Sequence, residues 1–212
     1  MEKFSCRGRP RRIQLLETHE ITPVSHISLL NGQSKRSAAE DTITKEYYCF
    51  LCKEKNSNSK SDTFIVGTFV ANDFLKLLKL KPLPLFNVLK NDDENYIKKA
   101  EKKNILIEKE KWNELALELY NVTNIIIMVW DRCGGPLAEI LLRIKKYYTK
   151  EPYDSIIKSI NTIISKDREK RTIYDMINWI KERNVIKTYE FPLIKNRLKN
   201  IGIENYITGN GT

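Results

Sequence analysis

Two runs of aromatic and β-branched residues place the strongest constraint on how this chain of 212 residues can fold. The runs cover residues 46–52 and 63–70, and the polar segment 53–62 separates them. Such residues fit the pleated surface of a strand, and a polar stretch between two such runs is typical of a hairpin loop. The sequence therefore predicts an antiparallel β-hairpin over residues 46–70.

Helical patterns dominate the chain after this hairpin. Phe74, Leu77 and Leu78 recur at helical spacing, and Asn72 or Asp73 can cap the helix that they define. Prolines and threonines at the starts of later apolar segments are typical of helix N-termini. We expect helices over residues 74–80, 110–120, 136–148, 152–165, 173–183 and 192–201.

Residues 124–130 form a continuous apolar run bounded by turn residues. A run of this kind is typical of a buried strand, and it is far too short to span a bilayer. Residues 105–107 and 189–191 are expected to be shorter strands. The predicted fold class is α+β, helix-dominated, with a small antiparallel β-hairpin element.

Composition divides the chain into three predicted parts. Residues 1–45 are poor in large apolar residues after Leu16 and rich in Ser, Thr, Arg and Gln, which predicts a flexible basic N-terminal arm. Residues 46–165 are expected to form an α+β core domain. Residues 166–212 are expected to form a C-terminal helical basic segment, with a charged linker near 166–171.

The chain carries a net charge of +10, which favours polyanionic partners, although a lysine-rich composition alone would also produce it. Four arginines gather near the N-terminus around Gly8 and Pro10, namely Arg7, Arg9, Arg11 and Arg12. Arginines on an extended segment are attracted to the narrow, negative minor groove of A·T-rich DNA.

The sequence Arg7-Gly8-Arg9-Pro10 resembles the core of an AT-hook, a short DNA-binding element of many chromatin proteins. In that family the Arg-Gly-Arg core lies in the minor groove, so the resemblance implies this role for Arg7, Gly8 and Arg9. Arg11 and Arg12 would contact phosphates. The alternatives are a nuclear-import signal or a nonspecific basic tail.

The C-terminal segment offers a second basic surface. Lys195, Arg197 and Lys199 lie in one predicted helix, and aromatic residues such as Tyr174 and Trp179 are interspersed upstream. A compact helical unit with one basic face can lie on a duplex. The alternative is an ordinary solvated face over an aromatic core.

Cys49 and Cys52 form a Cys-x-x-Cys pair, which is half of a tetrahedral zinc site. His19 and His26 are the only histidines and would complete a Cys₂His₂ set with unusual spacing. Zinc is therefore a candidate cofactor, and the alternative is a pair of small buried cysteines with two exposed histidines.

His19-Glu20-Ile21-Thr22-Pro23, followed by the cysteine pair, also resembles the arrangement of HNH nucleases. In that family a histidine acts as general base where this chain has Glu20. The resemblance implies a divergent nuclease, with a carboxylate in place of the usual base.

Residues 131–135, Asp-Arg-Cys-Gly-Gly, precede a predicted helix and could bind an anion or activate the thiol of Cys133. The alternative is a tight structural turn. The four cysteines form no disulfide framework, and the first residues lack the apolar core of a secretory signal. We therefore expect a nuclear protein, or a cytoplasmic one in a prokaryotic source.

These features favour a non-enzymatic DNA-binding accessory subunit of a chromatin, recombination/repair or transcription complex. It would contact A·T-rich duplex through the arginines and dock on other subunits through apolar segments such as 83–88. The alternatives are a protein-interaction scaffold with a nuclear-import signal and, from a different class, the divergent HNH-like nuclease.

Overall fold

The computed structural model describes residues 4–56, 60–90 and 112–209. The chain divides into two compact units, and each is described by itself. The first contains Met1–Asn87 and Thr123–Arg143, and the second contains Val88–Val122 and Ile144–Thr212. The described residues are α+β and rich in helix, which confirms the predicted fold class.

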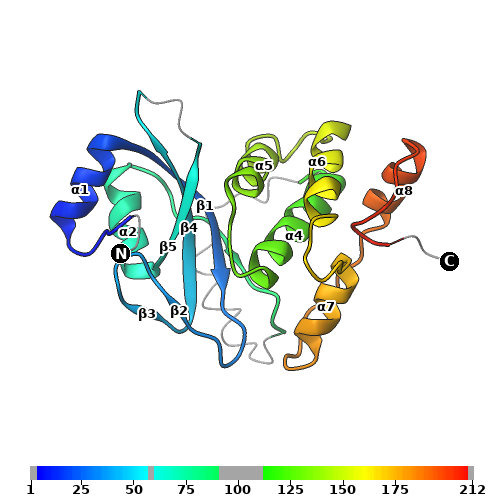
Figure 1. Cartoon of the computed structure of the whole chain (residues 1–212), viewed down its shortest axis with the longest axis horizontal. Helices are drawn as coiled ribbons and strands as arrows, with labels where there is room; N and C mark the ends of the chain where they lie inside the picture. The colour runs from blue at the N-terminus through cyan, green and yellow to red at the C-terminus, as the bar shows by residue number, and fades with distance from the viewer. Residues whose placement is uncertain (1–3, 57–59, 91–111, 210–212) are drawn as a thin grey trace. The chain divides into compact units, whose positions relative to one another are not determined.

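The first unit is built around a four-stranded sheet with the order β5-β4-β1-β6. Figure 1 labels the first three of these strands. β4 (Glu46–Glu54) pairs antiparallel with both β1 (His19–Ser28) and β5 (Asp62–Gly67), while β6 (Leu85–Phe86) runs parallel to β1. The β4–β5 pair is the predicted hairpin. A second, two-stranded sheet pairs β2 (Lys35–Arg36) with β3 (Thr42–Ile43).

Helices α1 (Arg9–Thr18) and α2 (Thr68–Leu77) cover one face of the large sheet (Figure 1). Their core contains packed aromatic rings, with Phe50 stacked on Phe64 at 5.5 Å and tilted against Phe74 at 5.4 Å between ring centroids. On the opposite face, Ser25 donates a 2.5 Å hydrogen bond to Asn124. Because both faces are covered, most of β1 and β4 is buried.

Residues 4–45 do not form the predicted flexible arm, because they fold into a helix and three strands. Residues 4–45 hold α1, β1, β2 and β3, and Ile21, Val24 and Ile27 are buried in the sheet. Polar residues of β1 find distant partners, as Ser25 does, so a segment of modest hydrophobicity can still lie inside the protein.

The predicted strand at residues 124–130 is also wrong, because these residues belong mostly to helix α4 (Glu114–Val129). Ile125, Ile126 and Ile127 are all buried. A helix that is apolar all round loses the 3.6-residue periodicity that would identify it, so it resembles a buried strand in sequence.

Other boundaries differ by a few residues. α2 begins at Thr68, inside the run assigned to a strand, and ends at Leu77. The predicted strand at 189–191 is absent from the described residues, where only an isolated bridge joins Leu89 to Ile186. The predicted strand at 105–107 lies outside the described residues.

The second unit is helical. Helices α6 (Asp154–Ile164), α7 (Ile173–Lys181) and α8 (Pro192–Asn200) lie close to their predicted positions. α5 (Gly135–Lys146) begins in the first unit, as α4 ends there. Thr172 caps α7 through a reciprocal pair of hydrogen bonds with Asp175, as its position predicted.

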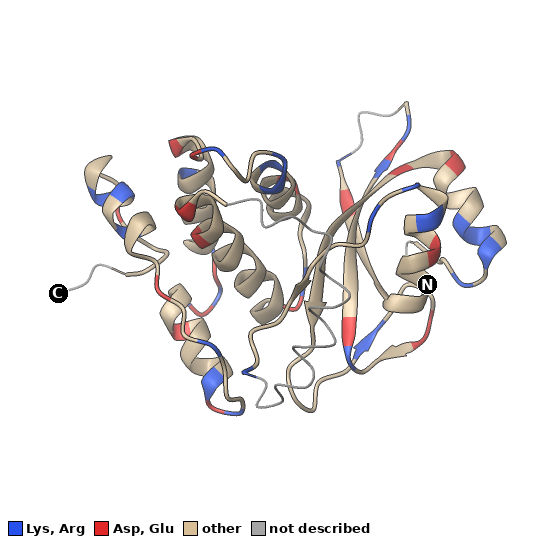
Figure 2. Ribbon diagram, turned by 180° about the vertical axis from the view of Figure 1, so that it is seen from behind, with Lys and Arg blue, Asp and Glu red and all other residues tan. Residues whose placement is uncertain are grey.

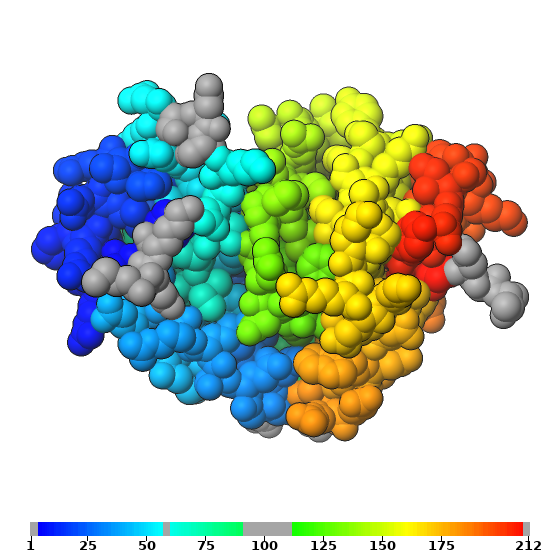
Figure 3. Space-filling model, viewed as in Figure 1, coloured from blue at the N-terminus to red at the C-terminus, as the bar shows by residue number. Residues whose placement is uncertain are grey.

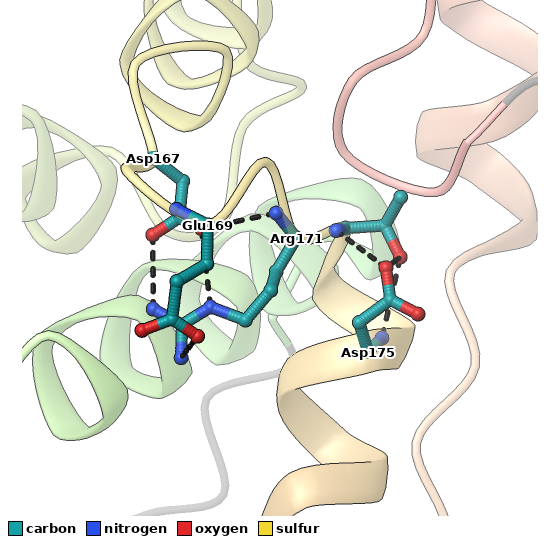
Figure 4. A network of polar contacts seen from close by, with 5 residues as sticks. Asp167, Glu169, Arg171 and Asp175 are labelled. Carbon is teal, nitrogen blue, oxygen red and sulfur yellow. Dashed lines mark hydrogen bonds and ion pairs between the residues drawn. The ribbon is translucent and has the colours of Figure 1, made fainter.

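The segment expected to be a linker, 166–171, is a tight turn within the second unit (Figure 4). The buried carboxylate of Asp167 accepts hydrogen bonds from the backbone of Glu169 and Arg171 and a bidentate pair from the Arg171 guanidinium at 3.0 and 3.1 Å. These contacts raise the pKa of Arg171. A run of polar residues can therefore form an ordered turn when one carboxylate accepts hydrogen bonds from the N–H groups of that run.

Candidate nucleic-acid interface

The arginine-rich segment is anchored to the fold at its start. The backbone N–H of Cys6 donates a 3.0 Å hydrogen bond to the carbonyl of Ala38, and the side chains of Phe4 and Cys6 are buried. Helix α1 begins at Arg9, with Pro10 in its first turn. Gly8 adopts φ +83°, a conformation that favours glycine and that sets the entry of the chain into the helix.

Arg12 is part of the fold. Its Nε lies 2.6 Å from a carboxylate oxygen of Asp73 on α2, and its Nη1 donates to the carbonyl of Cys6 at 3.2 Å. The Arg12 side chain is only 8% exposed. The predicted phosphate contact by Arg12 is therefore wrong for this conformation, because its donors already join α1 to α2.

The other three arginines are exposed. Figure 2 shows, in blue, the basic positions along α1. Arg7 is 70% exposed beside Glu40 at 3.2 Å, and Arg9 is 65% exposed at 3.9 Å from Asp73. Arg11 donates a 2.8 Å hydrogen bond to Ser5. Surface ion pairs of this kind contribute little, so these guanidinium groups can exchange their partners for phosphate at small cost. Figure 3 shows the α1 segment, in dark blue, at the surface of the first unit.

The predicted basic face of the last helix is smaller than expected. Lys195 and Lys199 lie four residues apart on α8 and are both exposed, so they share a face. Arg197 points elsewhere, with its Nε 2.6 Å from Asp154 and its Nη1 3.2 Å from Glu151. Arg197 stabilises the packing of α8 on α6, and the two lysines remain available.

The predicted zinc ligands are not brought together. Cys49 and Cys52 are three residues apart on β4, so their side chains point to opposite faces of the sheet. Cys52 packs in the aromatic core, whereas Cys49 contacts Cys133 on the other face, and burial raises the pKa of the Cys49 thiol. All four cysteines are free thiols and buried.

The two histidines have other neighbours. His26 stacks on Tyr48 at 4.0 Å between ring centroids and lies 3.5 Å from Glu46, whose pKa it lowers. His19 contacts the hydroxyl of Thr18 at 2.8 Å. In the parts of the chain that the structure describes, no three His, Cys, Asp or Glu residues form a group that could hold a metal ion. Zinc binding stays a prediction without a preformed site there.

The residues of the HNH-like arrangement are likewise not brought together as a metal site among the described residues. Glu20 is exposed on β1 and lies opposite Lys53 in the sheet. Neither His19 nor Glu20 belongs to a metal-holding group among the described residues.

Residues 131–134 connect α4 to α5, and Gly135 is the first residue of α5, in agreement with the interpretation of this segment as a structural turn. Asp131 adopts φ +55° and forms an ion pair with Lys35, while the Thr63 hydroxyl donates to the carbonyl of Cys133. Burial lowers the pKa of Lys35 to about 8. The sequence did not single out Lys35, because its partner Asp131 lies almost a hundred residues away.

The proposed docking segment 83–88 is partly used inside the protein. Phe86 pairs with Ile27 in the sheet and is buried, and the carbonyl of Val88 accepts a 2.9 Å hydrogen bond from the backbone N–H of Lys187. The most exposed large apolar side chain of the described residues is instead Phe69, at 84%, in the first turn of α2.

The chain belongs to the family described as Uncharacterised conserved protein UCP028583, whose model matches residues 5–206. No curated protein and no solved structure gives a significant match to the chain. The described residues contain no helix long and apolar enough to cross a membrane.

Proposed function

We propose that this chain is a non-enzymatic DNA-binding accessory subunit of a chromatin, recombination/repair or transcription complex. The observation that carries the proposal is the placement of Arg7, Arg9 and Arg11 at the exposed start of α1, while Arg12 fixes that helix to α2. Cations held on an ordered element lose less conformational entropy on binding than cations on a free tail.

The contact would combine two kinds of interaction. Arg7 and Arg9 flank Gly8, which has no side chain to keep the backbone away from a groove, so they would enter the minor groove of A·T-rich duplex. Arg11 would contact phosphates. Lys195 and Lys199 of α8 would add phosphate contacts that carry no sequence preference.

Protein partners are part of the proposal. Phe69 is exposed on α2, and large exposed aromatic side chains are enriched among the residues that anchor protein interfaces. A DNA-binding subunit of a nuclear complex would use such a residue to dock on a neighbouring subunit. Nuclear localisation belongs to this proposal and would be tested by replacing Arg7, Arg9 and Arg11 with alanine in a fluorescent fusion.

The test is a duplex-binding titration of the full chain. Arg7→Ala combined with Arg9→Ala should weaken binding to an A·T-rich duplex more than binding to a G·C-rich duplex of equal length. The matched control combines Arg143→Ala with Arg168→Ala, two exposed arginines outside the candidate interface. An equal loss of affinity for both duplexes would show that the segment acts only through its positive charge. No loss of affinity for either duplex would overturn the proposal.

A further inference from the structure

A cavity of about 300 Å³ lies in the first unit, beside β5 and the turn that follows α4. Its polar lining includes Arg36, Thr63, Asp131 and Arg132, and Phe64 contributes to its apolar wall. This volume is at the lower end of the range of small-molecule sites, and a mainly apolar wall with a few convergent polar groups is typical of them.

The two arginines are held at the cavity by their neighbours in sequence. Lys35 forms an ion pair with Asp131, and its side chain is only 9% exposed. Arg36 follows Lys35 and Arg132 follows Asp131. The ion pair therefore fixes the two backbone segments that carry the guanidinium groups.

The turn itself is fixed to the edge of the sheet. Thr63 of β5 donates to the carbonyl of Cys133, and Ser61 donates a 2.7 Å hydrogen bond to Glu139 on α5. The backbones approach so closely that a Cβ on Gly135 would lie 2.8 Å from the carbonyl oxygen of Ser61. The cavity is thus bounded by segments that are joined to one another, which favours a preorganised site.

The cavity lining holds two arginines, Arg36 and Arg132, and two aspartates, Asp62 and Asp131. The ion pair with Lys35 compensates the charge of Asp131, which leaves one positive charge in excess around the cavity. Within the described ranges, the guanidinium groups of Arg36 and Arg132 have no ion-pair partner, and both residues are exposed. Two free guanidinium groups beside one cavity favour an anion, because each can present paired N–H donors to a phosphate.

We infer that this cavity binds a phosphate monoester attached to a group of nucleoside size, with Arg36 and Arg132 holding the phosphate. The apolar wall around Phe64 would contact the flat part of the ligand. The ligand can be a free mononucleotide or the 5′-phosphorylated end of a nucleic-acid strand, since both present the same chemical group.

The test is calorimetric titration of the full chain with adenosine 5′-monophosphate, adenosine and inorganic phosphate in low-salt buffer. We expect the monophosphate to bind at least about tenfold more tightly than either of its parts, because charge-assisted hydrogen bonds and apolar contact both contribute. Short single strands with a 5′-phosphate or a 5′-hydroxyl, compared with the free monophosphate, show which source is preferred.

Arg36→Gln and Arg132→Gln should each weaken binding of the monophosphate at least about tenfold. Arg143→Gln, an exposed arginine outside the cavity, should leave binding unchanged. In the wild-type protein, the monophosphate should also protect Arg36 and Arg132 from modification by phenylglyoxal, which does not depend on the stability of any variant.

The inference is overturned if neither phosphorylated probe binds at millimolar concentration, or if adenosine binds as tightly as its monophosphate. It is also overturned if the double variant Arg36→Gln and Arg132→Gln binds like the wild type. Its failure is separate from that of the proposed DNA contact, since this double variant should keep duplex affinity and the Arg7→Ala and Arg9→Ala variant should keep monophosphate binding.

Discussion

Arg12 and Asp73 form a largely buried ion pair with a 2.6 Å hydrogen bond, and this pair joins the first two helices of the chain. The relationship connects one residue of the arginine-rich segment to the core of the first unit. Arg11, the preceding residue, is exposed, and Arg9, three residues before Arg12, lies 3.9 Å from the same carboxylate with most of its side chain in solvent.

Replacing Arg12 by alanine should therefore destabilise the protein strongly. The change leaves Asp73 with a poorly compensated charge, and breaking a buried pair from one side costs about 3–5 kcal/mol. Chemical denaturation followed by circular dichroism measures this loss. Arg11→Ala, one residue earlier and exposed, should change the free energy of unfolding by less than about 0.5 kcal/mol. Similar effects of the two substitutions would contradict the assigned role of Arg12.

Gly135 and Gly134 provide a second matched pair. A Cβ at Gly135 would lie 2.8 Å from the carbonyl oxygen of Ser61, whereas a Cβ at Gly134 meets nothing within 4 Å. Gly135→Ala should lower the free energy of unfolding by about 1–3 kcal/mol, the cost of overpacking. Gly134→Ala should be neutral within about 1 kcal/mol. The close approach of the start of α5 to Ser61, the residue before β5, would be refuted if Gly135→Ala were as stable as Gly134→Ala.

The stability of the protein should depend on pH through Lys35. Burial lowers its pKa from the ordinary value of 10.5 to about 8. Between these pH values the unfolded chain binds a proton at Lys35 that the folded protein does not, so unfolding becomes less favourable as the pH rises. The penalty for burying the charge is complete below about pH 8 and disappears toward pH 10.5.

Urea denaturation across this window should show the effect. The free energy of unfolding of the wild type should rise relative to that of Lys35→Met by on the order of 1–3 kcal/mol. Subtracting the variant removes the contributions of other groups that titrate in the same range. Parallel pH profiles for the two proteins would show that Lys35 is not buried as described.

The turn at 166–171 can be tested through its central carboxylate. Asp167 is buried and accepts hydrogen bonds from two backbone N–H groups and one guanidinium, so Asp167→Ala should cost about 3 kcal/mol. Glu169 contacts the same arginine at 3.3 Å but is 69% exposed, and Glu169→Ala should cost less than about 0.5 kcal/mol. Thermal denaturation of both variants would decide whether this segment is an ordered turn or a linker.

The sequence predicted those parts of the fold that depend on local patterns. The β4–β5 hairpin has strand-forming runs on both sides of a polar loop, and the capping box of α7 lies within four consecutive residues. Helix α6 was predicted because its apolar residues recur on one face. In each case the information lies within a few residues of the element that it specifies.

The errors arose where distant partners decide the structure. β1 contains Ser25 and His26, whose partners Asn124 and Glu46 lie elsewhere in the chain, so its sequence looks like that of an exposed segment. α4 is buried on all sides near its end and therefore lacks periodicity.

In the candidate sites too, the sequence indicated what depends on neighbouring residues and missed what depends on distant partners. The positions of Arg7, Arg9 and Arg11 marked the basic segment, but the pairing of Arg12 with a residue 61 positions away had no local sign. The cavity between Arg36 and Arg132 depends on an ion pair between Lys35 and Asp131, and only the folded chain brings these residues together.

The most direct test of the central proposal is the salt dependence of duplex binding by the full chain. We predict measurable affinity for duplex DNA in dilute buffer that falls linearly on a plot of log K against log salt. Removing Arg7, Arg9 and Arg11 together by substitution with alanine should reduce the magnitude of the slope by at least about 1, since the phosphate contact of Arg11 alone contributes about 0.9. Absence of any duplex binding in dilute buffer, or an unchanged slope in the triple variant, would contradict the proposal.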